Sequence, residues 1–296
     1  MNLEYLQSFY ITVKCNSISK AAKRLHLTQP GLSIQLQNLE NELGVSLLTR
    51  SNRGVKLTDE GKIIFDYAHT LLSIQGNMER DLKNIQEESP QLMIGSCKSI
   101  GEYALPCSIY TFKKLHSEVD INIELDNSTK IIEKLCDHTI NIGIIQYNPE
   151  INTLDTKIIT TDELLLVGNC DNTPEKISID ELKEIPLILR ENNSGTRIII
   201  EKALGDKDIY LEDLNIIYDM NSPEAIKSSI IAGNGFSFLP KLSMQKELSK
   251  DIIKQIKIND LFVPFYYYVA FRKNYEFTKY EEMFIDFITS TKKGFC

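Results

Sequence analysis

The first sixty residues carry apolar side chains at helical spacing in three consecutive stretches. Residues 3–14 and 18–25 predict two short helices. Leucine then recurs every third or fourth residue from 32 to 43, which predicts the buried stripe of a third helix. Thr28 is a good N-cap for this helix, and Gly44 ends it. Two helices joined by a tight turn, the second with a polar outer side, predict a helix-turn-helix.

The following stretch predicts a wing and then a long helix. Residues 45–57 predict a hairpin with its turn at 52–54. From Asp59 to Glu87 the helix would span on the order of 40 Å, at about 1.5 Å per residue. This helix has no core of its own, so its seam predicts a dimer; the alternative is that the seam packs on its own protein. The seam has a heptad spacing and comprises Ile64, Ala68, Leu71, Gln75, Met78, Leu82 and Ile85.

After Pro90 strands and helices alternate along the chain. The first set has strands at 92–95, 121–125 and 142–145, with helices around 100–116 and 129–137. The second set begins at 164–168 and includes a helix at 178–184, a strand at 186–190 and helices opening at 195 and 223. An aromatic strand at 266–271 and a helix around 278–290 finish the chain. This alternation predicts a mostly parallel sheet.

Composition excludes several classes of protein. No apolar run approaches the roughly 18 residues of a membrane span, and the N-terminus lacks the basic and apolar regions of a signal peptide. We therefore expect a cytoplasmic protein without membrane contact. Six cysteines without a CxxC pair and four histidines argue against a metal site or a disulfide framework, and no cofactor is expected. Reduced, buried thiols are the simple interpretation, with a redox role for Cys97 left open.

Charge is unevenly distributed along the chain. Residues 1–57 contain seven basic and three acidic side chains, a balance of +4 in a chain of net charge −8, so the remainder carries −12. A basic head on an acidic body indicates a nucleic-acid contact confined to the head.

Several motifs at fixed spacing resemble the LysR-type DNA-binding domain. They are SISKAAKRL at 17–25, TQPGLS at 28–33 and LTDEG at 57–61. Arg190 with SGTR at 194–197, and AGNG at 232–235, agree more loosely. The resemblance implies a homo-oligomer, often a tetramer, that binds promoter DNA. It also implies an effector domain like the two-lobed periplasmic-binding-protein fold (type II), with an effector in the interlobe cleft. Ile34 stands where Arg is common in the family, and Leu48 where Phe is usual.

The predicted recognition helix suggests a set of DNA-contacting residues. With the leucines inward, glutamine side chains point outward and can pair with adenine, while Ile34 can pack on a thymine methyl. Basic residues of the wing suit phosphate or minor-groove contact, although each taken singly could be a solvated surface charge. The candidate DNA-binding residues are Thr28, Gln29, Pro30, Ser33, Ile34, Gln37, Arg50 and Arg53.

Three predicted helix starts with polar residues follow predicted strands and suggest an effector site. In open α/β sheets ligands bind at the carboxyl ends of strands, where backbone N–H groups and hydroxyls suit a small anion. The alternative is that these serines only cap helices. The candidate effector-binding residues are Lys98, Ser99, Ile100, Ser128, Thr129, Arg190, Ser194, Gly195 and Thr196, with Arg197 as a further positive charge. The expected ligand is a small anionic metabolite or an inorganic oxyanion.

The predicted architecture is α + α/β in three parts. Residues 1–58 form a winged helix-turn-helix, 59–89 a linker and dimerisation helix, and 90–296 the effector-binding domain. Within that domain we expect lobe I at 90–161 and 267–296, and lobe II at 162–266. The predicted function is a DNA-binding transcriptional regulator, not an enzyme, whose partners are double-stranded DNA, a small effector, further copies of itself and, as a further candidate, RNA polymerase.

Two other functions remain as alternatives, a solute-binding protein and an enzyme on a periplasmic-binding-like fold. The sequence has no nucleophile elbow, HExxH, P-loop or GxGxxG motif, which disfavours the enzyme. The basic head disfavours a simple solute-binding protein.

Overall fold

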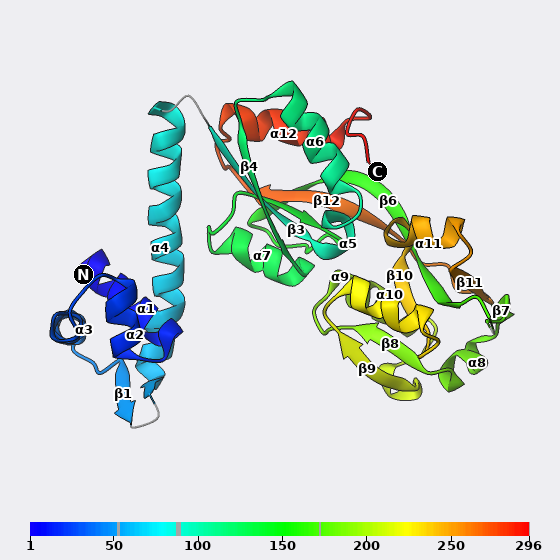
Figure 1. Ribbon diagram of the computed structural model, residues 1–296, viewed down its shortest axis with the longest axis horizontal. Helices are drawn as coiled ribbons and strands as arrows, with labels where there is room; N and C mark the ends of the chain where they lie inside the picture. Colours follow the sequence, from blue (N-terminus) through cyan, green and yellow to red (C-terminus); the bar gives the residue numbers. More distant parts are fainter. Residues whose placement is uncertain (52–53, 87–89, 172, 296) are drawn as a thin grey trace. The chain divides into compact units, whose positions relative to one another are not determined.

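The computed structural model describes residues 1–51, 54–86, 90–171 and 173–295 (Figure 1). Two compact units are present, Met1–Lys83 with Asp137–Thr139, and the rest of the chain; each is described by itself. None of the described helices combines the length and the apolar character that crossing a membrane would require.

The first unit is a winged helix-turn-helix, as the sequence predicts. Its helices are α1 (Leu3–Cys15), α2 (Ile18–Arg24), α3 (Gln29–Leu43) and the long α4 (Asp59–Gln86). The antiparallel strands β1 (Leu48–Ser51) and β2 (Gly54–Leu57) form the wing. The core is apolar and almost fully enclosed; it includes Leu6, Phe9, Ala21, Leu32, Leu36, Leu39 and Leu47.

Three local contacts fix the wing on the helices. The Glu40 carboxylate accepts hydrogen bonds from the amides of residues 47 and 48, at 2.7 and 3.2 Å. The side-chain oxygen of Asn16, which ends α1, accepts one from the Val55 amide at 3.0 Å. At the start of α4, a Cβ on Gly61 would lie 2.1 Å from the Leu47 carbonyl oxygen, so only glycine fits. Close packing therefore explains why the last residue of the LTDEG motif is glycine.

Two residues of the predicted seam of α4 pack within the chain itself. Ile64 and Ala68 pack into the core of the winged helix-turn-helix, where Ala68 is fully buried, so for these two positions the alternative interpretation holds. Close packing of α4 on α1 is the reason, with the Tyr10 and Phe65 rings stacked at 4.9 Å. The exposed apolar stripe of α4 is instead Ile63, Tyr67, Leu71, Ile74, Met78 and Leu82, between 37 and 66% exposed. The side chain of Ile85 lies outside the described residues.

The second unit contains a mixed eight-stranded sheet with the order β4-β3-β5-β12-β6-β11-β7, in which β10 also pairs with β6. The strands β3, β4 and β5 are parallel, whereas β12 lies antiparallel between β5 and β6. The expectation of a mostly parallel sheet is therefore wrong, because the chain returns late to insert β12 in the middle. The strands are β3 (Gln91–Cys97), β4 (Asp120–Asp126), β5 (Ile142–Ile145), β6 (Leu154–Asn169), β7 (Lys176–Ile177), β10 (Ser237–Pro240), β11 (Ile253–Ile258) and β12 (Pro264–Arg272).

Helices cover both faces of the sheet at its β4 end. Figure 1 shows α6 (Leu105–Leu115) and α12 (Lys279–Thr289) together on one face and α7 (Ser128–Cys136) on the other. Phe112 and Phe284 meet edge to face at 5.3 Å beneath the first pair. The helix predicted around 100–116 is two helices, α5 (Lys98–Gly101) and α6, because Pro106 is tolerated only in the first turn of a helix.

A second, smaller parallel sheet of β8 (Leu187–Arg190) and β9 (Ile216–Met220) lies at the other end of this unit. Its surrounding helices are α8 (Ile179–Glu184), α9 (Gly195–Gly205), α10 (Pro223–Ile231) and α11 (Gln245–Ser249), with 3-10 turns at Leu211–Asp213 and Lys241–Met244. The helix predicted at 178–184 begins with a capping box formed by Ser178 and Glu181.

The strands β6 and β12 connect the two halves of this unit (Figure 1). The predicted lobe boundaries at 161/162 and 266/267 fall within these two strands. We keep the names lobe I and lobe II for the predicted ranges, which remain a prediction.

One expectation about cysteines is wrong. Cys15, Cys97 and Cys170 are free thiols, but Cys107 is disulfide-bonded. The scattered positions of the cysteines in the sequence did not predict this disulfide. Among the described residues, no group of three or more His, Cys, Asp or Glu side chains is placed to hold a metal ion.

Candidate functional site

The outward side of α3 is uncovered. Gln29, Pro30, Ile34 and Gln37 are exposed, Ile34 to 61%, and Ser33 is half-buried. The leucines of the opposite side are enclosed in the core of the winged helix-turn-helix. The exposure of Ile34, a large apolar side chain, adds nothing to the stability of the helix-turn-helix. It is therefore the feature of α3 that packing within the domain does not explain.

The start of α3 is shaped by its cap. The exposed Thr28 has its hydroxyl oxygen accepting a hydrogen bond from the Gly31 amide at 3.2 Å, and Pro30 lies in the first turn. A Cβ on Gly31 would lie 3.0 Å from that hydroxyl. The TQPGLS motif therefore has a local structural role, because its threonine and proline fix where α3 begins.

Several basic side chains of the winged helix-turn-helix are also exposed. Lys20, Lys23 and Arg24 of α2 and Lys56 of β2 are exposed. The backbone of Arg50 lies in β1 opposite Val55, but its side chain, like all of Arg53, lies outside the described residues. The predicted wing contacts are therefore untested.

The predicted effector residues of lobes I and II meet around a residue that sequence reasoning missed, Gln146. Its side-chain oxygen accepts hydrogen bonds from the hydroxyls of Ser99 at 2.8 Å and Thr196 at 3.2 Å. Its backbone amide donates to the Ser128 hydroxyl at 3.1 Å. Gln146 is 1% exposed and directly follows β5, as Ser99 and Ser128 closely follow β3 and β4. Its place at the carboxyl end of the third predicted parallel strand was the available signal.

Gly195 allows lobe II to approach this group closely. A Cβ at this position would lie 2.7 Å from the Gln146 Cβ and 2.8 Å from the Ser128 hydroxyl oxygen. Any larger residue would push the start of α9 away from β5 and α7. We call Ser99, Ser128, Gln146, Gly195 and Thr196 the interlobe cluster.

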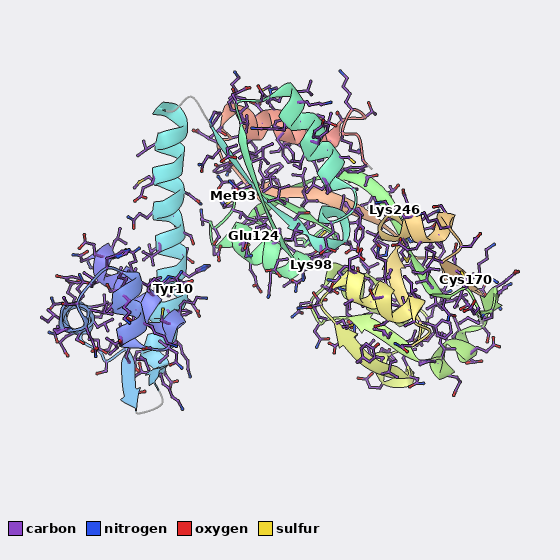
Figure 2. All side chains as sticks on the ribbon, viewed as in Figure 1. Tyr10, Met93, Lys98, Glu124, Cys170 and Lys246 are labelled. Atoms are coloured by element: carbon purple, nitrogen blue, oxygen red, sulfur yellow. The ribbon has the colours of Figure 1, made fainter. Side chains whose placement is uncertain are left out.

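Two further hydrogen bonds join the lobes beside this cluster. The Thr129 hydroxyl donates to the Asn193 carbonyl oxygen at 2.8 Å, and the Lys98 ammonium donates to the Asn221 carbonyl oxygen at 2.8 Å; Lys98 is labelled in Figure 2. Ser194 lies behind the cluster and caps α9, accepting from the Arg197 amide at 3.2 Å. For Ser194 the capping interpretation therefore accounts for the hydroxyl.

The two arginines predicted to attract an anion, Arg190 and Arg197, already form ion pairs with neighbouring glutamates. Arg190 is 3% exposed and forms two hydrogen bonds to the Glu191 carboxylate, at 2.8 and 3.1 Å. Arg197 is paired with Glu201 and donates to the Arg190 carbonyl oxygen at 3.3 Å. These pairs are largely neutral, so the arginines attract an anion less strongly than their number suggests.

Two buried residues near the cluster have simpler roles. Ile100 belongs to the main apolar core. Burial raises the pKa of the Cys97 thiol, whose sulfur lies 3.6 Å from the Ser99 hydroxyl oxygen. A thiol held neutral is a poor nucleophile, which disfavours the redox role left open for Cys97.

Polar atoms without partners remain in this region. Among the described residues, the side-chain nitrogen of Gln146 and the hydroxyl of Tyr267 are buried and form no hydrogen bond. Such groups are costly to bury, so they mark a place where a bound molecule could add stability.

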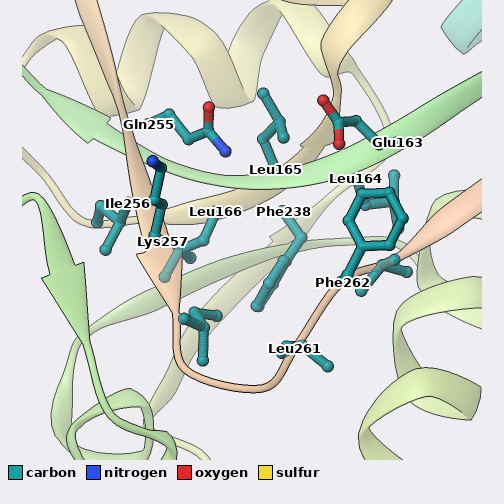
Figure 3. Close-up of a pocket in the computed structure, with 12 residues that line it drawn as sticks. Glu163, Leu164, Leu165, Leu166, Phe238, Gln255, Ile256, Lys257, Leu261 and Phe262 are labelled. Atoms are coloured by element: carbon teal, nitrogen blue, oxygen red, sulfur yellow. The ribbon is translucent and has the colours of Figure 1, made fainter.

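A separate hollow of about 280 Å³ lies over β6 and β11 (Figure 3). The close-up shows Leu166, Phe238 and Ile256 among its apolar walls, with Glu163 and Lys257 also lining it. None of the predicted effector residues lines this hollow.

Two family models match the chain. Residues 3–62 match the bacterial regulatory helix-turn-helix protein model of the lysR family, and residues 86–293 match the LysR substrate binding domain. These matches confirm the resemblance of the motifs in residues 17–61 and extend it over the effector domain.

Relatives agree along most of the chain. A "Probable RuBisCO transcriptional regulator" of Trieres chinensis is 30% identical over 254 residues, 83% of this chain and 82% of that protein. An "Uncharacterized HTH-type transcriptional regulator" of Methanocaldococcus jannaschii is 29% identical and covers 97% of this chain and 98% of that protein.

Solved structures share the fold. The LysR family regulator CbnR, at 19% identity, aligns with a TM-score of 0.75 over 97% of this chain and 98% of that chain. The regulatory domain of Synechocystis PCC6803 CcmR, solved with 2-PG, is also 19% identical and aligns with a TM-score of 0.62 over 67% of this chain and 95% of that chain.

Proposed function

Since the chain belongs to the LysR family of transcriptional regulators, which combine a helix-turn-helix with an effector-binding domain, we propose that it reads promoter DNA with the outward side of α3 and responds to a small effector held by the interlobe cluster. The observation that carries the proposal is the uncovered polar side of α3 opposite its enclosed leucines. The proposed domain division is the one predicted from the sequence.

In the proposed complex α3 lies in the major groove. Gln29 and Gln37 pair with adenine edges, and Ile34 packs on a thymine methyl. Thr28, Pro30 and Ser33 lie at the groove edge, while Arg50 and Arg53 contact phosphates and give affinity without sequence preference.

The exposed stripe of α4 supports a homodimer. Six apolar side chains recur at three- and four-residue steps along one side of this helix, from Ile63 to Leu82. A partner helix would remove them from water and add the knobs-into-holes packing of a coiled coil. The family resemblance extends the proposal to a tetramer, with RNA polymerase as a further partner.

We assign a small anion to the interlobe cluster. The hydroxyls of Ser99, Ser128 and Thr196 and the first amides of α7 and α9 supply donors, and Lys98 supplies a charge beside them. Replacing the hydrogen bond from Thr196 to Gln146 by ligand contacts would change how the lobes meet. The CcmR regulatory domain solved with 2-PG, and that of QuiR solved with shikimate, support a small ligand.

The DNA proposal is tested with Gln29→Ala. One lost base contact of about 1–3 kcal/mol is expected to weaken binding to the specific site by at least about fivefold and to leave non-specific binding nearly unchanged. Gel-shift titrations at fixed salt measure both. Gln7→Ala, an exposed glutamine of α1, is the matched control. Equal losses on specific and non-specific DNA would reject base reading by Gln29.

The effector proposal is tested by thermal shift of the full chain. Sulfate, phosphate and succinate are the probes, and stabilisation by at least one of them is expected to shrink in Thr196→Val. If only cationic or large apolar compounds stabilise the protein, the anionic effector is rejected while the DNA proposal stands.

A further inference from the structure

A cavity of about 480 Å³ lies between the lobes, apart from the interlobe cluster. Lobe I contributes Glu102 and Tyr103, which follow α5; lobe II contributes Glu224 and Lys227 of α10 and residues in the 242–247 stretch. Lys246, labelled in Figure 2, is one of these. None of the candidate effector-binding residues lines this cavity.

The buried cation of this cavity has no free donor. Lys227 is 3% exposed, and its ammonium contacts the Glu224 carboxylate at 2.7 Å, the Glu247 carboxylate at 2.9 Å and the Ser243 carbonyl oxygen at 3.1 Å. An ammonium has three N–H groups, so all three are used. The Tyr103 ring also lies over it, 4.5 Å from the nitrogen to the ring centre.

The opposite wall carries the unsatisfied groups. Among the residues that the structure describes, one carboxylate oxygen of Glu102 and the Tyr103 hydroxyl are buried and form no hydrogen bond of normal geometry, and burial together with the nearby Glu224 and Glu102 carboxylates raises the pKa of that hydroxyl. Within the part of the chain that the structure describes, no Lys, Arg or His side chain forms an ion pair with Glu102. Burial raises the pKa of Glu102, and this effect outweighs the opposing attraction of the Lys98 and Arg190 charges.

We propose that this cavity binds a small organic cation whose ammonium group pairs with Glu102 and the Tyr103 hydroxyl. An anion would find the Lys227 donors occupied and would face three carboxylates, those of Glu102, Glu224 and Glu247, against two ammonium groups. A protonated amine supplies both the missing donor and the missing charge.

Such a ligand would act on the arrangement of the lobes. Its two polar partners belong to lobe I, while the remaining lining residues belong to lobe II, so a bound cation contacts both. It would stabilise the arrangement in which Tyr103 covers Lys227. This inference goes beyond the proposed function and does not depend on the anionic effector of the interlobe cluster.

Three compounds with the same four-carbon chain separate charge from shape: 1,4-diaminobutane, 1,4-butanediol and succinate. Calorimetric titration of the full-length chain at neutral pH is expected to give binding of the diamine at least tenfold tighter than of the diol. The affinity of the diamine is expected to fall as the pH falls and Glu102 becomes protonated. No binding of the diamine, or equal binding of the diol, would overturn the inference.

Two variants test whether the diamine binds in this cavity. Glu102→Gln removes the charge and keeps the shape, and is expected to weaken diamine binding at least tenfold; Glu282→Gln, an exposed glutamate of α12, is the matched control. Tyr103→Phe keeps the ring over Lys227 and is expected to weaken binding about threefold, the loss of one hydrogen bond.

Thr196→Val distinguishes this site from the interlobe cluster. It is expected to leave diamine binding unchanged while it reduces any stabilisation by the anionic probes. If Thr196→Val abolishes diamine binding and Glu102→Gln does not, the amine binds at the interlobe cluster and the inference is wrong.

Discussion

The two candidate sites present their polar groups in opposite ways. On α3 the polar side chains face outward, and the helix is held in place from its other side by leucines. In the interlobe cluster the polar groups face one another and are almost fully buried. The difference separates two kinds of recognition. The α3 face is held from its buried side and leaves its outer side chains unengaged, whereas the hydroxyls of the interlobe cluster already bond to Gln146 and must exchange these internal hydrogen bonds for a ligand.

The comparison fails if the two sides of α3 are not energetically distinct. Leu36→Ala removes a side chain that is 2% exposed and is expected to lower the free energy of unfolding by about 2–5 kcal/mol, through lost burial and a residual cavity. Ile34→Ala, on the exposed side of the same helix, is expected to change it by less than about 0.5 kcal/mol. Urea unfolding followed by circular dichroism measures both, and similar losses would show that α3 has no free side.

The hydrogen bonds within the interlobe cluster are tested with Gln146→Leu. The variant leaves the buried hydroxyls of Ser99 and Thr196 without their acceptor and is expected to lower the unfolding free energy by about 1–3 kcal/mol. Thr196→Val removes one donor and is expected to cost less. Thermal unfolding without ligand measures the difference. A Gln146→Leu protein as stable as the parent would mean that these hydrogen bonds contribute nothing to the contact between the lobes.

A third effect concerns the pH dependence of stability, through Asp162 in β6, one of the two strands that join the lobes. Burial raises the pKa of Asp162, in β6, to about 6, although its carboxylate accepts weak hydrogen bonds from the Leu242 amide at 3.3 and 3.4 Å. The folded state therefore holds this proton more tightly than the unfolded state, so the contribution of Asp162 to stability is present below pH 3.8 and is lost as the pH rises through about 6.

Asp162→Asn removes this dependence. The stability of the variant relative to the parent is expected to increase by about 3 kcal/mol between pH 3.5 and pH 7. Urea unfolding of both proteins across this range measures the trend, and Asp286→Asn, an exposed aspartate of α12, is the control. A relative stability that stays constant with pH would show that Asp162 has an ordinary pKa. No such pH window is expected for the α3 face, which has no ionisable residue among its candidate contacts.

Sequence reasoning was most successful where structure is decided locally. Thr28 begins α3 as predicted, and Gly44 ends it in the left-handed region at φ 72°. These features depend on a few neighbouring residues, so the sequence contains nearly all the information that they need. The motif resemblance added the family, which the family models confirm.

The sequence by itself determined the helix-turn-helix, the buried side of α3 and the positions where strands end in polar residues. Only the tertiary structure decided that β12 lies between β5 and β6, that Ala68 packs into the core of the winged helix-turn-helix and that Gln146 joins hydroxyls of both lobes. The physical reason is that periodicity reports which side of an element is buried, but not which distant segment buries it. Contacts between residues 50 positions apart, such as Gln146 and Thr196, are fixed by the packing of whole elements rather than by local preference.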